Sequence, residues 1–285
     1  MAVTNGWGQG AKDNTIDWGQ GATDNTIDWG KSQTVSASGD TNISGSGGTP
    51  AFVNTKSILL DGVDDYVNCG TNSSLNFERT DAFSYSLWVK RNSIGTNHIL
   101  LSKMNPTGNR RGMFFNLNTS NVIAVLLRTD TSTTNQRLNI KSTTTIADSN
   151  WHHIVFTSDG SSTIGGCKIY IDGVSDTLNS DGNLSATIEN TAPFLIGALS
   201  TAPLLPADAI IDEVAVFNSE LSASNVTSIY NGGGTGLPGD LTDLSPLSWW
   251  RCGDGDTSPT LTDNGSASNN GTMTNFTAFS TDVPT

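Results

Sequence analysis

The carboxyl groups of this chain are the side chains that could support hydrolysis, and their spacing argues against it. Hydrolysis of a glycosidic bond takes two carboxyl groups that flank the bond, one as acid and one as base or nucleophile. The chain has only four glutamates, and none of them begins such a cluster: Glu78, Glu189, Glu213 and Glu220. Asp212 and Glu213 are adjacent in an apolar run, so on a strand their side chains should point to opposite faces. We therefore predict that the protein is not an enzyme.

A dense acidic turn is the second group of residues that could do chemistry. Asp61, Asp64 and Asp65 follow one another within a few positions. Three carboxylates this close repel one another unless a cation or the N–H groups of the turn satisfy them. The sequence leaves both alternatives open.

Histidine and cysteine carry no catalytic or metal-binding pattern. His152 and His153 alternate faces on a predicted strand, and His98 stands alone. The three cysteines have no CxxC spacing, and no HExxH motif, nucleophile elbow or P-loop is present. We expect the histidines to serve packing and strand hydrogen bonding.

The charge balance excludes two classes of partner. The formal net charge is −13, from 14 basic and 27 acidic residues. Binding to nucleic acid needs a concentrated basic face, and binding to an anionic membrane needs a polybasic patch, and neither is evident. No apolar stretch approaches the length of a membrane span. The N-terminus lacks the basic and apolar regions of a signal peptide, which predicts a protein made in the cytoplasm.

Short apolar runs separated by turns are the elements that must position these groups. Residues 83–89 alternate between apolar and other side chains, as a half-buried strand does. Further strands are predicted at 99–101, 113–115, 122–127, 152–156, 167–171 and 210–217. Residues 222–231 alone predict a helix, with Ser222 at its start and Gly232 after its end. Many antiparallel strands with one short helix indicate an all-β sandwich.

The N-terminal segment contains a repeat. Residues 7–17 recur as residues 18–28 with only Lys12 replaced, by Thr23, and Trp29 opens a third copy. Two or three units are too few to close a core of their own, so the large apolar side chains need another surface. We predict that residues 1–31 form an anchoring arm that docks on neighbouring subunits. The alternative is that the arm folds back on its own sandwich.

The anchoring side chains of this arm are its tryptophans and isoleucines: Trp7, Ile16, Trp18, Ile27 and Trp29. Residues 32–50 follow as a Ser/Gly linker that is flexible by composition. Residues 51–233 are predicted to form the sandwich, and residues 234–285 a C-terminal segment.

Five motifs of the central region resemble those of laminin-G-like, concanavalin A-like domains, in the order of that family. They are residues 57–67, 83–90, 151–155, 168–173 and 211–222. The resemblance implies an antiparallel jelly-roll β-sandwich. It implies no single function, because the fold carries lectins, adhesion modules, glycosidases and structural proteins.

The C-terminal segment departs from the order of the family. Residues 247–254 and 263–272 resemble the strand that begins such domains, ahead of the acidic turn. The sandwich is therefore predicted to be permuted, with this segment supplying a strand or hairpin to its own sandwich or to a neighbouring subunit. A separate hairpin tail is the third alternative.

The resemblance also implies a candidate metal site, since many members of the family hold Ca²⁺ between loops. The ligands would be Asp61, Asp64 and Asp65, with Asp212 or Glu213 from a neighbouring strand. The alternative is a tight turn without an ion.

The two ends of the chain resemble those of tailed-bacteriophage virion proteins. This resemblance implies a virion structural or accessory protein, a capsid decoration, head-fibre or tail-fibre component, assembled in the host cytoplasm. Its partners would be capsid or tail subunits and further copies of itself, with a trimer as the first guess. A glycan-binding adhesin is the alternative, and a polysaccharide depolymerase is a third hypothesis.

Overall fold

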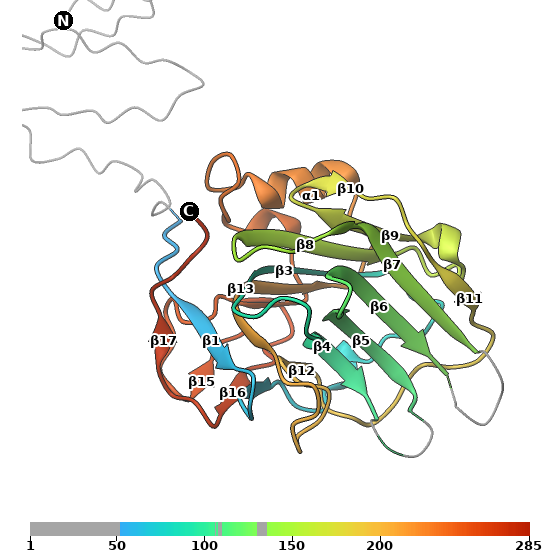
Figure 1. Ribbon diagram of the computed structural model, residues 1–285, viewed down its shortest axis with the longest axis horizontal. Coiled ribbons are helices and arrows are strands. Elements are labelled where there is room, and N and C mark those ends of the chain that lie inside the picture. The colour runs from blue at the N-terminus through green and yellow to red at the C-terminus, as the bar shows by residue number, and fades with distance from the viewer. Residues whose placement is uncertain (1–51, 106, 108–109, 130–135) are drawn as a thin grey trace, which may run out of the picture. The chain divides into compact units, whose positions relative to one another are not determined.

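Two antiparallel β-sheets lie face to face in the computed structural model, which describes residues 52–285 apart from 106, 108–109 and 130–135 (Figure 1). The predicted all-β antiparallel sandwich is thereby confirmed. The predicted anchors Trp7, Ile16, Trp18, Ile27 and Trp29 and the predicted linker lie outside the described residues.

The first sheet contains β1 (Ser57–Asp61), β3 (Phe83–Arg91), β8 (Trp151–Ser158), β9 (Cys167–Ile171), β10 (Val174–Ser175), β13 (Asp208–Phe217), β14 (Ser248–Trp250) and β17 (Phe279–Ser280). Their order across the sheet is β10-β9-β8-β3-β13-β1-β17. β13 is its long central strand. On one side it pairs with β3 along its length, and on the other it pairs with β1 and then β14.

The second sheet contains β2 (Tyr66–Asn68), β4 (His98–Met104), β5 (Gly112–Leu117), β6 (Val122–Arg128), β7 (Arg137–Thr145), β11 (Asp181–Asn183), β12 (Leu195–Ile196), β15 (Thr260–Leu261) and β16 (Gly271–Thr274). Their order is β11-β7-β6-β5-β4-β12-β2-β16-β15. Three short 3₁₀ helices lie in the connections, at Ser73–Leu75, Ile164–Gly166 and Thr242–Leu244.

The core fills the space between the sheets, and strand alternation decides which side chains enter it. Leu87 and Val89 of β3 and Ile123, Val125 and Leu127 of β6 are buried there. Because side chains alternate along a strand, the residues between them face outward. On β6 these are Ala124, Leu126 and Arg128.

The helix α1 (Ala223–Tyr230) covers part of the outer face of the first sheet. Ser222 caps it: its hydroxyl accepts from the backbone N–H of Asn225, and the Asn225 side chain accepts from the N–H of Ser222. Val226 and Ile229 pack in a second apolar cluster with Phe217 and Trp249. The helix predicted at residues 222–231 is present.

The C-terminal segment supplies strands to both sheets of its own chain. β14 pairs with β13 from Val214 to Val216, and β16 pairs with β2. The indole of Trp250 is fully buried, stacks on Phe194 with ring centroids 5.8 Å apart, and donates to the carbonyl of Asn269. Of the three alternatives for this segment, the structure has the intramolecular one.

Candidate functional site

A polar pocket opens where the turn between β4 and β5 meets the segment before β12. Its volume is about 400 Å³. The lining side chains are amides, hydroxyls, one guanidinium and one carboxylate: Asn76, Asn105, Arg111, Thr187, Glu189, Asn190 and Thr191. Asn76, the turn between β4 and β5, and the segment before β12 are far apart in sequence, and the sandwich brings them together.

Hydrogen bonds to the backbone fix the wall of the pocket. Asn190 donates through Nδ2 to the carbonyl of Lys103 over 3.1 Å and accepts from the N–H of Ala192 over 2.8 Å. The N–H of Asn190 donates to Oδ1 of Asn76 over 3.1 Å. The N–H of Asn105 donates to the carbonyl of Arg111 over 3.0 Å, which closes the turn. Asn76 and Asn190 are therefore fixed relative to each other, and Asn190 is hydrogen-bonded to β4 through Lys103.

Beneath the pocket lies a smaller hollow with aromatic walls. It shares Asn76 and Asn190 with the pocket and is lined further by Phe77, Phe83 and Tyr85. Phe77 is partly buried and stacks on Phe83 with ring centroids 4.9 Å apart. The hollow has a volume of only about 10 Å³, and Phe83 and Tyr85 are buried, so these rings support the pocket from the core side and offer no surface for a ligand.

Sequence reasoning had named only Glu189 of these lining residues, and only as a glutamate without a partner. Among the described residues it is the one carboxylate that lines the pocket. Asn76, Asn105 and Asn190 lie in ordinary connections between elements. Nothing in their local sequence distinguishes them from the many other Asn residues in turns.

The predicted acidic turn is present, but it contains only part of the expected ligand set. One oxygen from each of Asp61, Asp64 and Asp65 lies within 4.8 Å of the others. Oδ1 of Asp61 accepts from the N–H of Val63 over 2.8 Å, and Oδ2 of Asp65 accepts from the N–H of Asp61 over 3.1 Å. Turn N–H groups thus already satisfy two of the carboxylates, as in the alternative without an ion. Burial, with smaller contributions from Asp61 and Asp64, raises the pKa of Asp65.

Asp212 and Glu213 do not join this turn, which corrects the predicted five-residue grouping. Asp61 lies opposite Asp208 in the register of β1 and β13. Asp212 follows four residues later on β13, which is about 13 Å along a strand. Among the described residues, the group of acidic side chains that could hold a metal ion consists of the three turn aspartates alone.

A β-bulge also corrects the predicted directions of these two side chains. The register of β13 against β3 shifts between Asp212 and Ala215, and Glu213 has a φ of 47°. Ile211 and Val214 both enter the core, so Glu213 is the extra residue and shares the outer side with Asp212. Two carboxyl groups are therefore buried next to each other. Asp212 has an exposed fraction of 0 % and Glu213 one of 3 %.

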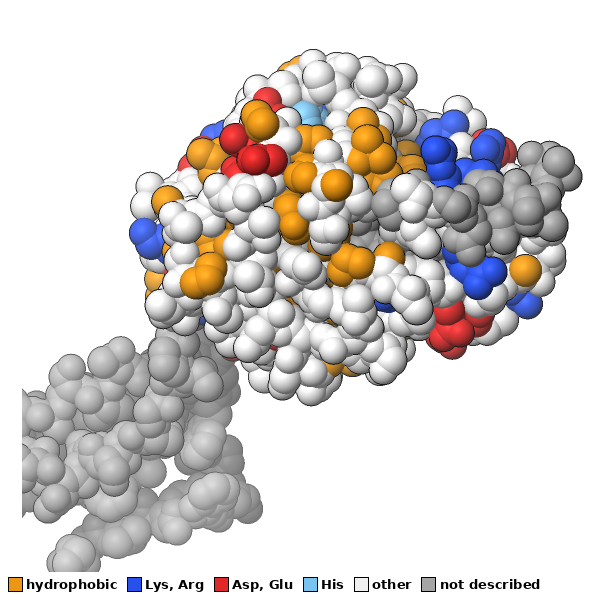
Figure 2. All heavy atoms as spheres, turned by 90° about the horizontal axis from the view of Figure 1, so that it is seen from below, with side chains coloured by type: hydrophobic (Ala, Val, Ile, Leu, Met, Phe, Trp, Pro, Cys, Tyr) orange, Lys and Arg blue, Asp and Glu red, His pale blue; other side chains and the backbone are white. Residues whose placement is uncertain are grey.

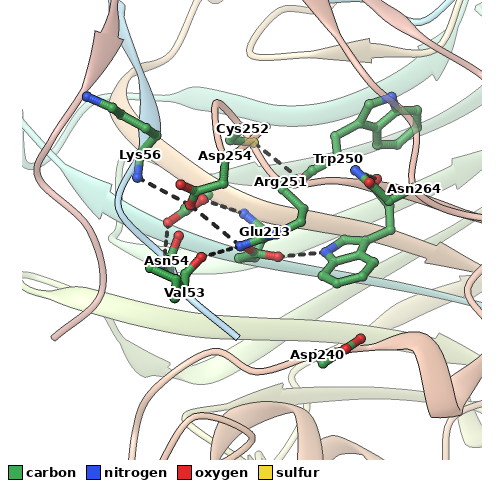
Figure 3. Close-up of polar contacts among 12 residues, drawn as sticks. Val53, Asn54, Lys56, Glu213, Asp240, Trp250, Arg251, Cys252, Asp254 and Asn264 are labelled. Carbon is green, nitrogen blue, oxygen red and sulfur yellow. Dashed lines mark hydrogen bonds and ion pairs between the residues drawn. The ribbon is translucent and has the colours of Figure 1, made fainter. Parts of the chain in front are cut away.

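The C-terminal segment covers this carboxyl pair (Figure 3). Glu213 accepts from the indole N–H of Trp249 over 2.6 Å and pairs with Arg251 over 3.4 Å. Arg251 also donates to the carbonyl of Val53 and lies 3.6 Å from Asp254. Asp212 accepts from Nδ2 of Asn54 over 2.9 Å, and no cation lies within ion-pair distance of it among the described residues.

Burial dominates the electrostatics of this pair. It raises the pKa of Glu213 to about 7, although Arg251 and the Trp249 indole oppose the shift. Burial and the neighbouring charge of Glu213 raise the pKa of Asp212 well above its ordinary value. One guanidinium faces this pair and Asp254, so the positive charge is smaller than the charge of three carboxylates, and this imbalance adds to the burial that favours the protonated form of Asp212. The hydrogen bonds and the ion pair of these two residues connect β13 to the C-terminal segment and to Asn54. Because both residues are buried, they do not form a site that is open to solvent.

The histidines have the structural roles that the sequence predicts. His153 is buried, its Nε2 lies 2.9 Å from Oγ of Ser86, and its ring packs against the rings of Trp88 and Tyr230, with centroids 5.1 Å and 6.0 Å away. Burial lowers the pKa of His153 to about 3. The carboxylates of Asp172 and Asp148, which accept hydrogen bonds from the imidazole of His152, raise the pKa of this histidine.

Comparisons with known proteins agree with this architecture. Residues 61–227 match the family model of the concanavalin A-like lectin/glucanases superfamily. No curated protein matches the sequence significantly. In the described part of the chain, no helix has the length and apolar character needed to cross a bilayer.

Among solved structures, a putative carbohydrate binding protein from Bacteroides ovatus superposes with a TM-score of 0.58 at 15 % sequence identity, covering 81 % of this chain. This chain spans 61 % of the length of that protein. Domain 4 of an extracellular arabinanase from Geobacillus stearothermophilus, solved with arabinotriose, has a TM-score of 0.41 at 21 % identity, covering 60 % of this chain and 75 % of that one. A sialyllactose-bound CBM40 of a Ruminococcus gnavus sialidase has a TM-score of 0.45 at 11 % identity, covering 61 % and 97 %.

Proposed function

The chain belongs to the concanavalin A-like lectin/glucanases superfamily, and we propose that it is a non-catalytic glycan-binding domain. The observation that carries the proposal is the pocket of about 400 Å³ at the end of the sandwich. A sugar presents many hydroxyls that both donate and accept, and the pocket offers amides, hydroxyls, a guanidinium and a carboxylate to meet them. The name of the Bacteroides ovatus protein supports the same class of ligand, while its likeness to this chain concerns the fold.

The positions of the acidic residues support binding without hydrolysis. Glu189 is the single carboxylate among the described residues that line the pocket. Hydrolysis of a glycosidic bond takes a second carboxyl group across the bond. Asp212 and Glu213, which lie next to each other, are buried beneath the C-terminal segment. We therefore keep the proposal that the protein is not an enzyme.

Glycan-array binding of the full chain, followed by calorimetry on the best ligand, tests the function. Asn105→Ala and Glu189→Ala each remove a polar group from the pocket. Each should weaken binding about tenfold, which corresponds to the loss of one or two hydrogen bonds.

Asp243→Ala is the matched control, because this exposed acid lies in the 3₁₀ helix Thr242–Leu244 outside the pocket lining. It should bind as the unmodified chain does. Absence of binding to every glycan of a broad array would refute the proposed function. Unchanged affinity in both pocket variants would place the site elsewhere.

The virion role remains a prediction from the two ends of the sequence. The repeat at residues 7–30 lies outside the described residues. The residues Ser248–Arg251 of the other end build β14 and cover Glu213, so the sandwich itself requires them. Deleting residues 2–31 should abolish incorporation into particles while leaving the sandwich folded, and a truncated protein that still joins particles would contradict the anchoring role.

A further inference from the structure

Basic residues are concentrated in one stretch of this acidic chain, which corrects the expectation from the overall charge balance that no concentrated basic face exists. Residues 82–147 contain eight Lys and Arg and a single acidic residue, Asp130. The whole chain has 14 basic and 27 acidic residues, so the remainder is strongly acidic. This stretch runs from β3 to β7 and builds four neighbouring strands of the second sheet, β4 to β7.

The accessible part of this charge lies on the outer face of the second sheet. Leu127, Leu138 and Ile140 point into the core, so Arg128 of β6 and Arg137 and Lys141 of β7 point outward. Arg91 and Lys103 of the same stretch are buried and do not contribute to the surface. Seen from below Figure 1, Lys and Arg side chains gather mainly at one end of the molecule, with some Asp and Glu side chains beside them (Figure 2). We call Arg128, Arg137 and Lys141 the basic face.

Within the basic face, two like charges lie directly opposite each other. Arg128 and Arg137 are register partners across β6 and β7. Directly opposed like charges destabilise a sheet. The one acidic partner within ion-pair distance among the described residues is Asp181, at 3.4 Å from Arg137 and exposed. Three basic groups against this one acid leave the face with a net positive charge, which favours a negatively charged ligand.

Apolar surface and the pocket adjoin this charge. Phe114 and Leu126, register partners on β5 and β6, are partly buried and lie on the same outer face. Gly112 is the register partner of Arg128, and Arg111 before it lines the pocket. A ligand that enters the pocket can therefore continue over the basic face.

We propose that the basic face is a binding surface for an anionic polysaccharide, whose carboxylate or sulfate groups meet Arg128, Arg137 and Lys141. The inference rests on the proposed glycan binding and names the charge class of the glycan. Phe114 supplies the apolar surface on which a sugar ring packs. The overall charge of the chain repels polyanions elsewhere, so binding is confined to this face.

Titration of the full chain with dextran sulfate, polygalacturonate and neutral dextran tests the proposal. The sulfated or the carboxylated polymer, or both, should bind at about 0.05 M salt and be released near 0.5 M, because screening shortens the range of these attractions. Neutral dextran should not bind. The difference between the two anionic polymers tells which anion the face selects.

The double substitution Arg128→Gln and Lys141→Gln should weaken binding of the anionic polymer about tenfold. Its melting temperature should be unchanged or higher, because the opposed arginine pair is relieved. The control variant carries Lys56→Gln and Lys168→Gln, which remove the same amount of charge from positions at or next to strands of the first sheet. Its affinity for the anionic polymer should stay within about twofold of that of the unmodified chain.

Three outcomes would overturn the inference. Equal affinity of the Arg128/Lys141 variant and the unmodified chain would show that this face is not used. Binding of neutral glycans alone would remove the anionic class while the proposed glycan binding stands. Equally tight binding of duplex DNA would show a general polyanion surface rather than a glycan site.

Discussion

Asp212 and Glu213 couple the stability of the sandwich to pH. Their pKa values are raised in the folded chain, that of Glu213 to about 7, because both groups are buried. Above the ordinary carboxyl pKa of about 4, the folded state therefore holds protons that the unfolded chain has released. The free energy of unfolding falls as the pH rises from there through the folded pKa of Glu213. His98 and His153, whose pKa values are lowered, act in the opposite direction only below the ordinary histidine pKa of about 6.5. His152, whose pKa is raised, acts in the same direction as the carboxyl pair.

We predict that the melting temperature falls between pH 6.5 and 8.5. For each proton that the folded chain holds and the unfolded chain does not, it should fall by about 2–4 °C per pH unit. Asp212→Asn should remove much of this slope and raise the melting temperature at pH 8.5. The new amide can donate to Oδ1 of Asn54, which has no hydrogen-bond partner among the described residues, once the Asn54 amide rotates. Calorimetry at both pH values is the measurement.

Asp263→Asn is the matched control, and its expected effect has the opposite sign. The carboxylate of Asp263 accepts from the backbone N–H groups of Trp249, Gly265 and Asn269, at 2.6–2.8 Å. An amide in its place turns a donor toward a donor and should cost about 1–3 kcal/mol at either pH. If both variants destabilised equally at pH 8.5, Asp212 would be an ionised, well-solvated group and the account of the pair would be wrong.

At the scale of the element, β14 is the strand on which the pair depends. It covers the edge of β13 from Val214 to Val216, and its Trp249 indole hydrogen-bonds Glu213. Without it, β13 exposes unpaired backbone groups and two carboxyl groups enter water beside an apolar surface.

Removal of residues 248–285 should therefore prevent folding and give an aggregated product, measured by circular dichroism and size-exclusion chromatography. Removal of residues 1–51 takes away none of the described strands and should leave a folded sandwich. A folded, monodisperse product of the C-terminal truncation would mean that β14 is dispensable.

The elements also show how far sequence reasoning reaches in this chain. The alternation of residues 83–89 and the Ser222 cap are local signals, and β3 and α1 follow them. The bulge in β13 has no local signal, because Glu213 adopts a positive φ where glycine would be the usual residue. The pocket joins three connections, and only the completed sandwich determines which of the many Asn residues meet there. Periodicity predicts an element, whereas a site depends on contacts between distant segments.

At the scale of the whole molecule, the order of strands in the chain can be separated from their order in space. Ser57 of β1 is the register partner of Ser280 of β17, and the strands are antiparallel. The residues before β1 and after β17 therefore leave the sheet at the same end, where the C-terminus lies near the start of β1 (Figure 1). The hydroxyl of Ser57 also donates to the carbonyl of Asp282 over 2.6 Å.

This proximity predicts that the sandwich tolerates circular permutation. A chain that begins at Gly236, runs to Thr285, continues through a short Gly/Ser linker to Phe52 and ends at Thr235 keeps every described strand pair. Its new ends lie in an exposed turn, and it places β14 to β17 ahead of the acidic turn, the order that the family resemblance leads one to expect. Its melting temperature should lie within about 5 °C of residues 52–285 in their natural order, because a short linker adds little closure entropy. A second permutant opened between Glu213 and Val214 cuts the buried bulge of β13 and should not fold. If the first permutant failed as well, the natural order of the C-terminal strands would itself be required for folding.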